Sequence, residues 1–442
     1  MSHLIQISDN SKKEFEPKQL EELRALSGLP IKSTQQEGNP NLLIFTHSLS
    51  DCPDKIQDSP IFTIEGDHIL SSGNIMGFVG YKNTRLRIYS RFAKEDEQDF
   101  FLHYMLQRVF AINLFDLQYN SAQTDIFDFL IYLFPSYLKR AYRQGLYKEY
   151  KTHHYNDAHL RGRIDVAQHI RTNIPFNGNI AYQTREYAYN NDLTQLIRHT
   201  IEYIRQHPYA GGILLNDTGI KDAVKAIEHA TPTYNRQERS KVINHNLRPI
   251  HHPYYNEYRN LQQLCMQILR HEELKYGTTD DEIYGILFDG AWLWEEYLAI
   301  VLKNVLTHYT SDGPKRFRLF NKSYRRIVPD FLNEQAHIVA DAKYIPLDIS
   351  YIAEGSERET AIYYKTLVYM YRFKCSLGYL FYPLTDSSSH KQIETLTLFN
   401  DSTQVLHKVG LAIPQNVSSW VDFQNQMSKN EDAFIEQIKH QF

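Results

Sequence analysis

The sequence predicts a multidomain α+β protein with a β-rich N-terminal module (1–95), a helical and β middle region (96–278) and a C-terminal α/β domain with a mixed sheet (279–442). Three observations support this prediction. Glycine-separated β-type runs occupy residues 60–92, apolar spacings of three and four follow them, and residues 285–383 show the order helix, strands, helix, strand. At about 100–200 residues per domain, the chain has room for two or three domains.

Composition and charge exclude several classes of protein. Lys and Arg number 48 against 52 Asp and Glu, so the net charge of −4 excludes binding of nucleic acid by bulk positive charge but allows a local basic groove. The apolar content of 42% is typical of a globular chain. Three scattered cysteines without a CxxC pair indicate a reducing compartment, and the sequence shows no signal peptide or long apolar run. We therefore expect a cytoplasmic protein without a membrane partner.

The N-terminal part is expected to be loop-rich over its first 55 residues, apart from a short helix at 17–26, because prolines punctuate it. The runs 61–64 and 85–89 predict strands of a small β-domain. In the middle region, segments 97–150, 191–206, 221–229 and 255–276 have helical periodicity, residues 150–190 form short mixed segments, and residues 232–250 are polar. A turn at 277–281 marks the last predicted boundary.

The C-terminal domain should begin with a helix over Gly285 to Tyr309, followed by two β-type runs, a helix over 359–373 and a strand over 377–382. The two runs are joined by a short polar link. A four-residue loop at 334–337 would set residue 333 opposite 338 and 330 opposite 341. Because side chains alternate along a strand, this hairpin would bring Asp330, Asp341 and Lys343 together.

Two carboxylates and a lysine at one spot suit metal-assisted phosphodiester hydrolysis. Carboxylate oxygens hold Mg²⁺ while leaving water sites open, the metal polarises the phosphate, and a lysine can orient water or offset charge. The alternative is a surface hairpin with a cross-strand ion pair of little energetic value. Upstream, Glu295 lies at the border of an apolar helix face, where a metal would compensate its burial, while its neighbour Glu296 points more toward solvent.

A basic segment lies between this helix and the hairpin. Six cations fall in twelve residues without one acid, with aromatic residues interleaved: Lys315, Arg316, Arg318, Lys322, Arg325 and Arg326. The segment could follow a phosphate backbone beside the carboxylates. A solvated edge strand protected by positive charge is the equal alternative.

Together these residues match a known family. Glu295, Pro329-Asp330, Asp341-Ala342-Lys343 and Tyr364-Lys365 resemble the PD-(D/E)xK nuclease core, and more narrowly the McrC-type nuclease subunit of McrBC and LlaJI-like restriction systems. Arg161-Gly162-Arg163-Ile164 resembles the “RGRI” signature of that family. The stretches 187–193 and 74–92 resemble its helix entry and its N-terminal β-module, so the resemblance spans about 61–383.

The resemblance implies a restriction-endonuclease-like core and a type IV-like restriction endodeoxyribonuclease subunit that acts in phage defence. Asp330, Asp341 and Glu295 would hold Mg²⁺, with Glu296 as the alternative glutamate, and Lys343 and Lys365 would act beside them. Lys365 occupies a position where the family often has Gln. The partners would be double-stranded DNA and a McrB-type AAA+ GTPase hexamer, which this subunit would stimulate. The chain lacks GxxxxGK[ST], so we expect it to bind no nucleotide.

Arg161 and Arg163 could act in trans on the partner's GTPase, because cationic contacts assist phosphoryl transfer. A structural turn with paired arginines is the favoured alternative. Two other functions for the whole chain stay open: a regulatory partner with an inactive nuclease fold, and a stand-alone nuclease. The pairs His153-His154 and His251-His252 lack metal-ligand spacing and are expected to be ordinary surface residues.

Overall fold

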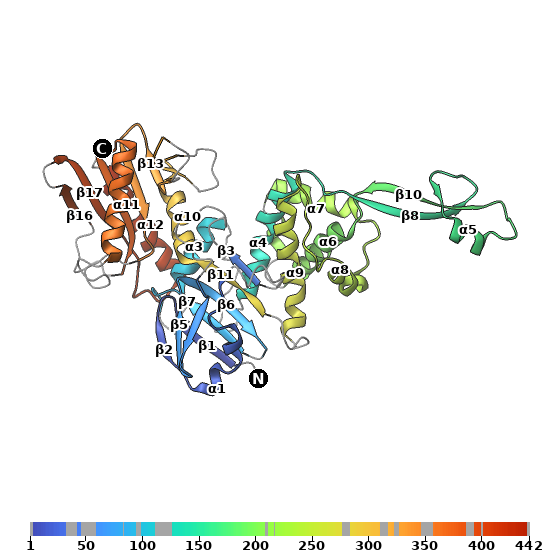
Figure 1. Ribbon diagram of the computed structural model, residues 1–442, viewed down its shortest axis with the longest axis horizontal. Coiled ribbons are helices and arrows are strands. Elements are labelled where there is room, and N and C mark those ends of the chain that lie inside the picture. Colours follow the sequence, from blue (N-terminus) through green and yellow to red (C-terminus); the bar gives the residue numbers. More distant parts are fainter. Residues whose placement is uncertain are drawn as a thin grey trace. The chain divides into compact units, whose positions relative to one another are not determined.

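The computed structural model describes residues 3–31, 42–45, 59–82, 84–93, 99–110, 126–207, 211–215, 217–275, 283–309, 317–321, 327–345, 357–385, 393–398 and 401–439. Two compact units make up the chain (Figure 1). Unit 1 combines Met1–Asn113 with Thr279–Phe442, and unit 2 is Leu114–Thr278. The three-part division stays a prediction, because one compact unit can contain more than one domain.

The N-terminal part of unit 1 contains two sheets. The larger has the order β1-β7-β6-β11-β3, with β1 His3–Ser8, β3 Leu42–Phe45, β6 Ile75–Tyr81, β7 Thr84–Tyr89 and β11 Ile283–Asp289. The smaller has the order β2-β5-β4, with β2 Lys12–Glu14, β4 Phe62–Glu65 and β5 Ile69–Ser72. Buried apolar side chains from both sheets form one core. The small β-domain expected at 60–92 is confirmed.

The expected loop-rich start is wrong in part, because β1, β2 and β3 lie within it. Strand β1 pairs in parallel with β7, with Ile5 opposite Leu86 and Ile7 opposite Ile88, and all four side chains are buried. A parallel partner about eighty residues away leaves no turn signal beside the first strand. The helix expected at 17–26 is present as α1 Pro17–Leu20 and a 3₁₀ turn at Glu22–Leu26.

The helix expected at Gly285–Tyr309 begins later than predicted. Residues Ile283–Asp289 form β11, which is antiparallel to β6 and parallel to β3, and α10 spans only Gly290–Val301. A short continuous apolar run has no periodicity that separates a buried strand from a buried helix. Asp289 ends the strand and begins the helix, because its side chain accepts a hydrogen bond from the Ala291 amide at 2.9 Å.

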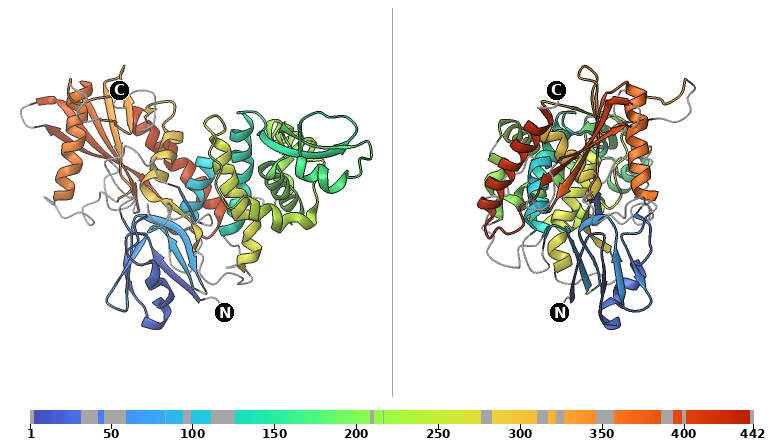
Figure 2. Two further views of the ribbon diagram at one scale, coloured as in Figure 1. Left: turned by 45° about the vertical axis from the view of Figure 1, so that its right-hand side comes forward. Right: turned by 90° about the vertical axis from the view of Figure 1, so that its left-hand side faces the viewer.

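The C-terminal part of unit 1 is a six-stranded mixed sheet with the order β12-β13-β14-β15-β17-β16. Its strands are β12 Thr307–His308, β13 Phe331–Asn333, β14 Ile338–Ala342, β15 Leu377–Leu384, β16 Ile393–Leu398 and β17 Asp401–Ala412. Helices α11 Glu357–Phe373 and α12 Trp420–Lys439 cover opposite faces (Figure 2). This arrangement, with α3 Phe100–Phe110 and α10, confirms the predicted mixed-sheet α+β class.

Unit 2 is a helical bundle with a long hairpin that projects from it (Figure 1). Its helices are α4 Ile126–Tyr142, α6 Asp192–Gln206, α7 Thr218–Ala230, α8 Arg239–His245 and α9 Glu257–Lys275, with short 3₁₀ turns at Gly211–Leu215 and Arg236–Glu238. Helix α6 begins with a capping box in which Asn191 and Thr194 cap each other's amides. Helix α8 lies in the polar stretch where the sequence predicted none, and the expected turn at 277–281 lies outside the described residues.

The hairpin consists of β8 Glu149–Asp157 and β10 Ile180–Ala188, with β9 Arg163–Ile164 added beside β10 and α5 Val166–Thr172 following β9. Gly162 is required here, because a Cβ on it would lie 2.3 Å from the Gln183 carbonyl oxygen. Within the described ranges, no helix has the length and apolar character needed to cross a membrane.

Candidate active site

The β13–β14 hairpin brings the predicted carboxylates together as expected. Asn333 lies opposite Ile338 and Phe331 opposite Ala340, so the predicted register is confirmed. The turn closes with His337 at φ 56°, and the Asn333 side chain accepts a hydrogen bond from the Ala336 amide. Asp330 precedes β13 and its Oδ2 accepts a hydrogen bond from the Ala342 amide at 2.7 Å, which fixes its carboxyl beside the end of β14.

Asp341 lies at the centre of the cluster and is fully buried. Its Oδ2 is 2.6 Å from Lys343 Nζ, and its Oδ1 is 3.2 Å from Lys365 Nζ on α11. Burial alone would raise the pKa of Asp341, but the two ammonium groups outweigh it and hold this pKa well below its ordinary value. Asp341 is therefore ionised across the physiological range, and two lysines from different elements neutralise it.

Asp330 has the opposite electrostatic environment. Desolvation raises its pKa well above the ordinary value, and the nearby charges of Asp341 and Glu295 raise it further. Lys365 and Lys343 lower it without reversing the shift. Neighbouring carboxyl groups whose pKa values are shifted in opposite directions are typical of functional sites. Repulsion between two ionised carboxylates disfavours the doubly charged state, and a bound cation would relieve that repulsion.

The structure also distinguishes the two candidate glutamates on α10. Glu295 is buried and its charge helps to raise the pKa of Asp330, whereas Glu296 is half-buried. Glu295 Oε1 lies 2.9 Å from Nε2 of His308 on β12. No pattern in the sequence indicates His308, because a single histidine thirteen residues after Glu295 follows no recognised spacing.

For the metal-dependent nuclease that the sequence predicts, we expect His308→Ala to slow cleavage by about tenfold to a hundredfold, because loss of a group that orients a metal-ligating residue has an effect of this size. His308→Gln should retain most activity, since its amide can still donate to Glu295. The measurement is the cleavage rate of DNA under single-turnover conditions. Equal rates for the wild type and the alanine variant would contradict an orienting role.

The residues present fit a magnesium ion with few protein ligands. In the described part of the chain, no three His, Cys, Asp or Glu side chains are grouped closely enough to hold a metal together. Mg²⁺ commonly needs only one or two carboxylates and keeps several waters. Asp341 and Asp330 supply two such carboxylates, and a cation would offset the repulsion between them when both are ionised. Glu295 is held nearby by His308. The three-carboxylate metal site stays a prediction.

Of the six cations in the predicted DNA-binding segment, only Arg318 lies within the described residues; its side chain is exposed and its carbonyl oxygen accepts a hydrogen bond from Arg372 on α11. The other five cations lie outside the described residues: Lys315, Arg316, Lys322, Arg325 and Arg326. The proposed electrostatic track beside the carboxylates therefore stays a prediction.

The two arginines of the hairpin in unit 2 have different surroundings. Arg161 pairs with Asp157 at 3.1 Å, donates to the Tyr182 hydroxyl at 3.0 Å and lies over the Tyr155 ring. Arg163 is exposed in β9, and no ion pair for it is found among the described residues. Arg161 thus agrees with the favoured structural interpretation, whereas Arg163 presents its guanidinium to solvent.

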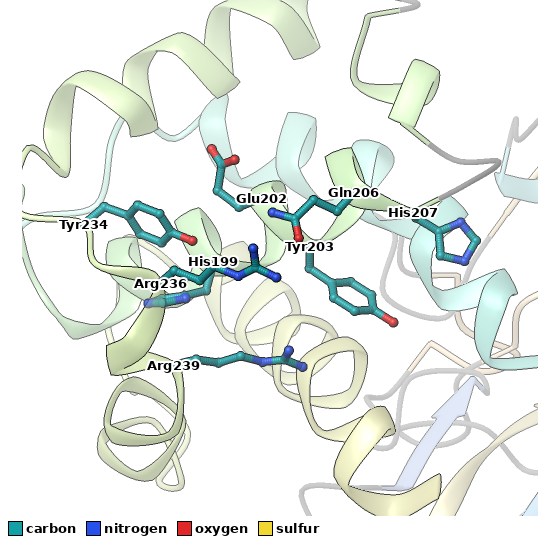
Figure 3. A pocket seen from close by; sticks show the side chains of 8 residues that line it. All are labelled: His199, Glu202, Tyr203, Gln206, His207, Tyr234, Arg236 and Arg239. Atoms are coloured by element: carbon teal, nitrogen blue, oxygen red, sulfur yellow. The ribbon is translucent and has the colours of Figure 1, made fainter.

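The paired histidines are ordinary hairpin and loop residues. His154 Nδ1 is 3.5 Å from Asp165, and His252 Nδ1 accepts from the Tyr254 amide. Unit 2 also contains a cavity of about 260 Å³ between α6 and α8 (Figure 3). None of the predicted site residues lines it, and its walls are His199, Glu202, Tyr203, Gln206, His207, Tyr234, Arg236 and Arg239.

Comparisons with known proteins identify a family and a similar fold. A family model described as the McrBC 5-methylcytosine restriction system component matches residues 70–383. A chain in the refined half-complex from a tetradecameric assembly of Thermococcus gammatolerans McrB AAA+ hexamers with bound McrC is similar in fold, with a TM-score of 0.51 and 17% identity over 98% of this chain and 100% of that chain. A chain in the cryo-EM structure of the Thermococcus gammatolerans McrBC complex has a TM-score of 0.34 and 18% identity, over 68% and 87%. No curated protein matches.

Proposed function

The chain belongs to the McrBC 5-methylcytosine restriction system component family, and from this premise we propose that it is the nuclease subunit of a GTP-dependent restriction complex. In this proposal it cuts double-stranded DNA with Mg²⁺, receives that DNA from a McrB-type AAA+ GTPase hexamer and stimulates the GTPase. The fold similarity to a chain of an assembly of AAA+ hexamers with bound McrC supports such a partner. The observation that carries the proposal is the buried Asp341 carboxylate between two lysines and beside Asp330.

The side chains of the cluster have separable roles in phosphodiester hydrolysis. Asp341 and Asp330 would hold Mg²⁺, with Glu295 as the third carboxylate. When bound, the ion would polarise the scissile phosphate and make an attacking water more acidic. The Lys343 ammonium, on a side chain 15% exposed, can then donate to a phosphate oxygen or orient water. Lys365, 31% exposed, adds a second positive charge against the negative charge that develops in the transition state.

The test is cleavage of plasmid DNA by the purified chain, with and without the partner, GTP and Mg²⁺. The proposal predicts that DNA is cut only when the chain, the partner, GTP and Mg²⁺ are all present. Cutting by the chain alone would support a stand-alone nuclease instead. A complex that hydrolyses GTP faster than the partner alone but never cuts would support the regulatory alternative. One observation favours that alternative: both carboxylate oxygens of Asp341 already contact ammonium groups.

The raised pKa of Asp330 predicts a pH dependence of metal binding. Its folded-state pKa lies above the ordinary carboxyl value, so the metal-free site retains a proton on Asp330 until the pH exceeds that raised pKa. Mg²⁺ must displace this proton, because carboxylates bind metal only when deprotonated. We therefore expect the half-saturating Mg²⁺ concentration for cleavage to fall as pH rises from mildly acidic to mildly alkaline. An unchanged half-saturation, measured by metal titration at each pH, would contradict this assignment.

The different surroundings of the two hairpin arginines predict different effects on the partner. Arg163→Ala should lower the stimulation of GTP hydrolysis by about tenfold or more. A guanidinium that acts in trans stabilises the negative charge in the transition state of phosphoryl transfer. Arg161→Ala should have the smaller effect, since Arg161 serves Asp157 and Tyr182. The measurement is GTP turnover at saturating amounts of each variant. A larger loss for Arg161→Ala would instead favour a purely structural role of this segment.

A further inference from the structure

Tyr344, the residue after Lys343, is held by the N-terminal part of unit 1. Its side chain is 2% exposed. The Arg91 guanidinium lies 5.0 Å from the centre of its ring, and the Phe92 ring packs edge-on at 5.7 Å between centroids. The Tyr344 hydroxyl lies 3.3 Å from Met76 Sδ on β6. The chain segment that carries Lys343 is therefore anchored, one residue later, on a side chain from β6 and on two side chains from the residues that follow β7.

Arg91 is itself fixed by a buried ion pair. Its Nε donates to Asp9 Oδ2 at 3.0 Å, a terminal nitrogen also contacts this oxygen, and its backbone amide donates to Asp9 Oδ1 at 2.6 Å. The side chain of Asp9 is fully buried and that of Arg91 is 9% exposed. A buried ion pair of this kind adds little net stability, because desolvation offsets the attraction. Its contribution is geometric: the guanidinium plane is fixed on one side of the Tyr344 ring.

The same cluster also holds the start of α10. A terminal nitrogen of Arg91 donates to Asn74 Oδ1 at 2.9 Å, and the Asn74 carbonyl oxygen accepts from the Gly290 amide at 2.9 Å. Gly290 is required at this point, because a Cβ on it would lie 2.7 Å from Tyr344 Cε1. The first residue of α10 and the aromatic ring after Lys343 thus lie in direct contact. Farther along the same helix is Glu295.

We propose that Asn74, Arg91 and Tyr344 are positioning residues for the nuclease site. They fix the start of α10, which carries Glu295, against the end of β14, which carries Asp341 and leads to Lys343. The inference rests on the proposed function and adds to it a requirement of the nuclease for the N-terminal β-sheet. Just beyond β14, the Lys343 amide donates a hydrogen bond to the Phe381 carbonyl oxygen at 2.8 Å. A displacement of about 1 Å at a reacting group can cost on the order of a hundredfold in rate.

Two variants remove the cluster and two matched variants leave it in place. Arg91→Met keeps the length of the side chain but removes its charge and donors, and Tyr344→Leu removes the ring. Tyr344→Phe retains the ring and loses only the hydroxyl contact with Met76. Leu70→Ala creates a cavity in the same N-terminal core but away from Tyr344, so it reports the effect of general destabilisation.

The experiment measures single-turnover cleavage, the half-saturating Mg²⁺ concentration and GTPase stimulation in the reconstituted complex, at a temperature where every variant is folded by circular dichroism. We expect Arg91→Met and Tyr344→Leu to slow cleavage by about tenfold to a hundredfold and to raise the half-saturating Mg²⁺ concentration. GTPase stimulation should be unchanged. Tyr344→Phe and Leu70→Ala should cut at close to the wild-type rate with an unchanged Mg²⁺ requirement.

Two results would overturn the inference while the proposed function stands. In the first, the wild-type complex cuts DNA, and the cluster variants cut it equally fast at the same Mg²⁺ concentration. In the second, Leu70→Ala slows cleavage as much as Arg91→Met does, because a general loss of stability would then explain both effects. A wild-type complex that never cuts would overturn the proposed function and this inference with it.

Discussion

Asp341→Asn should reduce DNA cleavage by on the order of a thousandfold or more, while the complex continues to stimulate GTP hydrolysis. The substitution keeps the shape of the side chain but removes the negative charge that Lys343 and Lys365 both contact. It also removes the carboxylate that we propose as a metal ligand, and whose lowered pKa keeps it ionised. Loss of a single electrostatic group in an active site costs about a hundredfold to a thousandfold, and loss of the proposed metal ligand Asp341 should cost at least that much.

The controls for this experiment come from the same cluster. Lys343→Ala should also lose most cleavage, whereas Glu296→Gln alters a half-buried carboxylate next to Glu295 and should cut almost normally. The cleavage rate of Glu295→Gln should lie between the rates of Lys343→Ala and Glu296→Gln. Thermal melts must show that Asp341→Asn remains folded, because the two lysines lose their buried counter-charge. Cleavage by Asp341→Asn at the wild-type rate would remove the basis for assigning the nuclease site to this hairpin.

The part of the site that the sequence predicts best is the local part. Asp330 and Asp341 lie in two β-type runs joined by a four-residue link, and the length of such a link fixes which residues pair. The observed pairing of Asn333 with Ile338 follows directly from it. Lys343 follows from the alternation of side chains along one strand. Each of these inferences needs only residues within about fifteen positions, where geometry is set by the chain itself.

The distant part of the site is harder to predict: Lys365 rests on the family resemblance alone, and Glu295 rests on that resemblance and on its place at the border of an apolar helix face. Glu295 and Lys365 come from helices on either side of the hairpin in the sequence, and periodicity alone cannot tell which turn of a helix faces a given strand. His308 was missed because its role arises from pairing between β12 and β13, which brings its ring near Glu295. Asp9, Asn74 and Arg91 lie farther still from Tyr344 in the sequence. No pattern near any of these residues indicates that they meet in the fold.

The fold was mispredicted where the chain crosses between sheets. Residues 283–289 join the N-terminal sheet between β6 and β3, although they lie some two hundred residues after β6. Their apolar run fits a buried strand and a buried helix equally well. Two glycines mark the difference in retrospect. Gly77 in β6 has φ 128° and Gly285 in β11 has φ 155°, and both lie where the two strands approach closely.

Gly285→Ala is therefore the second substitution for which we expect a large effect. A Cβ on Gly285 would lie 2.3 Å from the Phe78 carbonyl oxygen and 2.9 Å from Val79 Cα, both backbone atoms that cannot rotate away. Its φ also lies in the region that L side chains rarely adopt. We expect a loss of roughly 3–5 kcal/mol in stability, the range of a severe steric substitution in a core.

The matched control is Gly28→Ala, which has a positive φ of 75° but no atom within 4 Å of the added Cβ. It should cost only about 1–2 kcal/mol, the strain of a left-handed backbone alone. Differential scanning calorimetry compares the two melting temperatures, and Gly285→Ala should melt well below Gly28→Ala. Because β11 leads through Asp289 directly into α10, any folded fraction of Gly285→Ala should also cut slowly, since Glu295 moves with that helix. Equal melting temperatures for the two variants would show that β11 does not pack against β6 as closely as the structure places it.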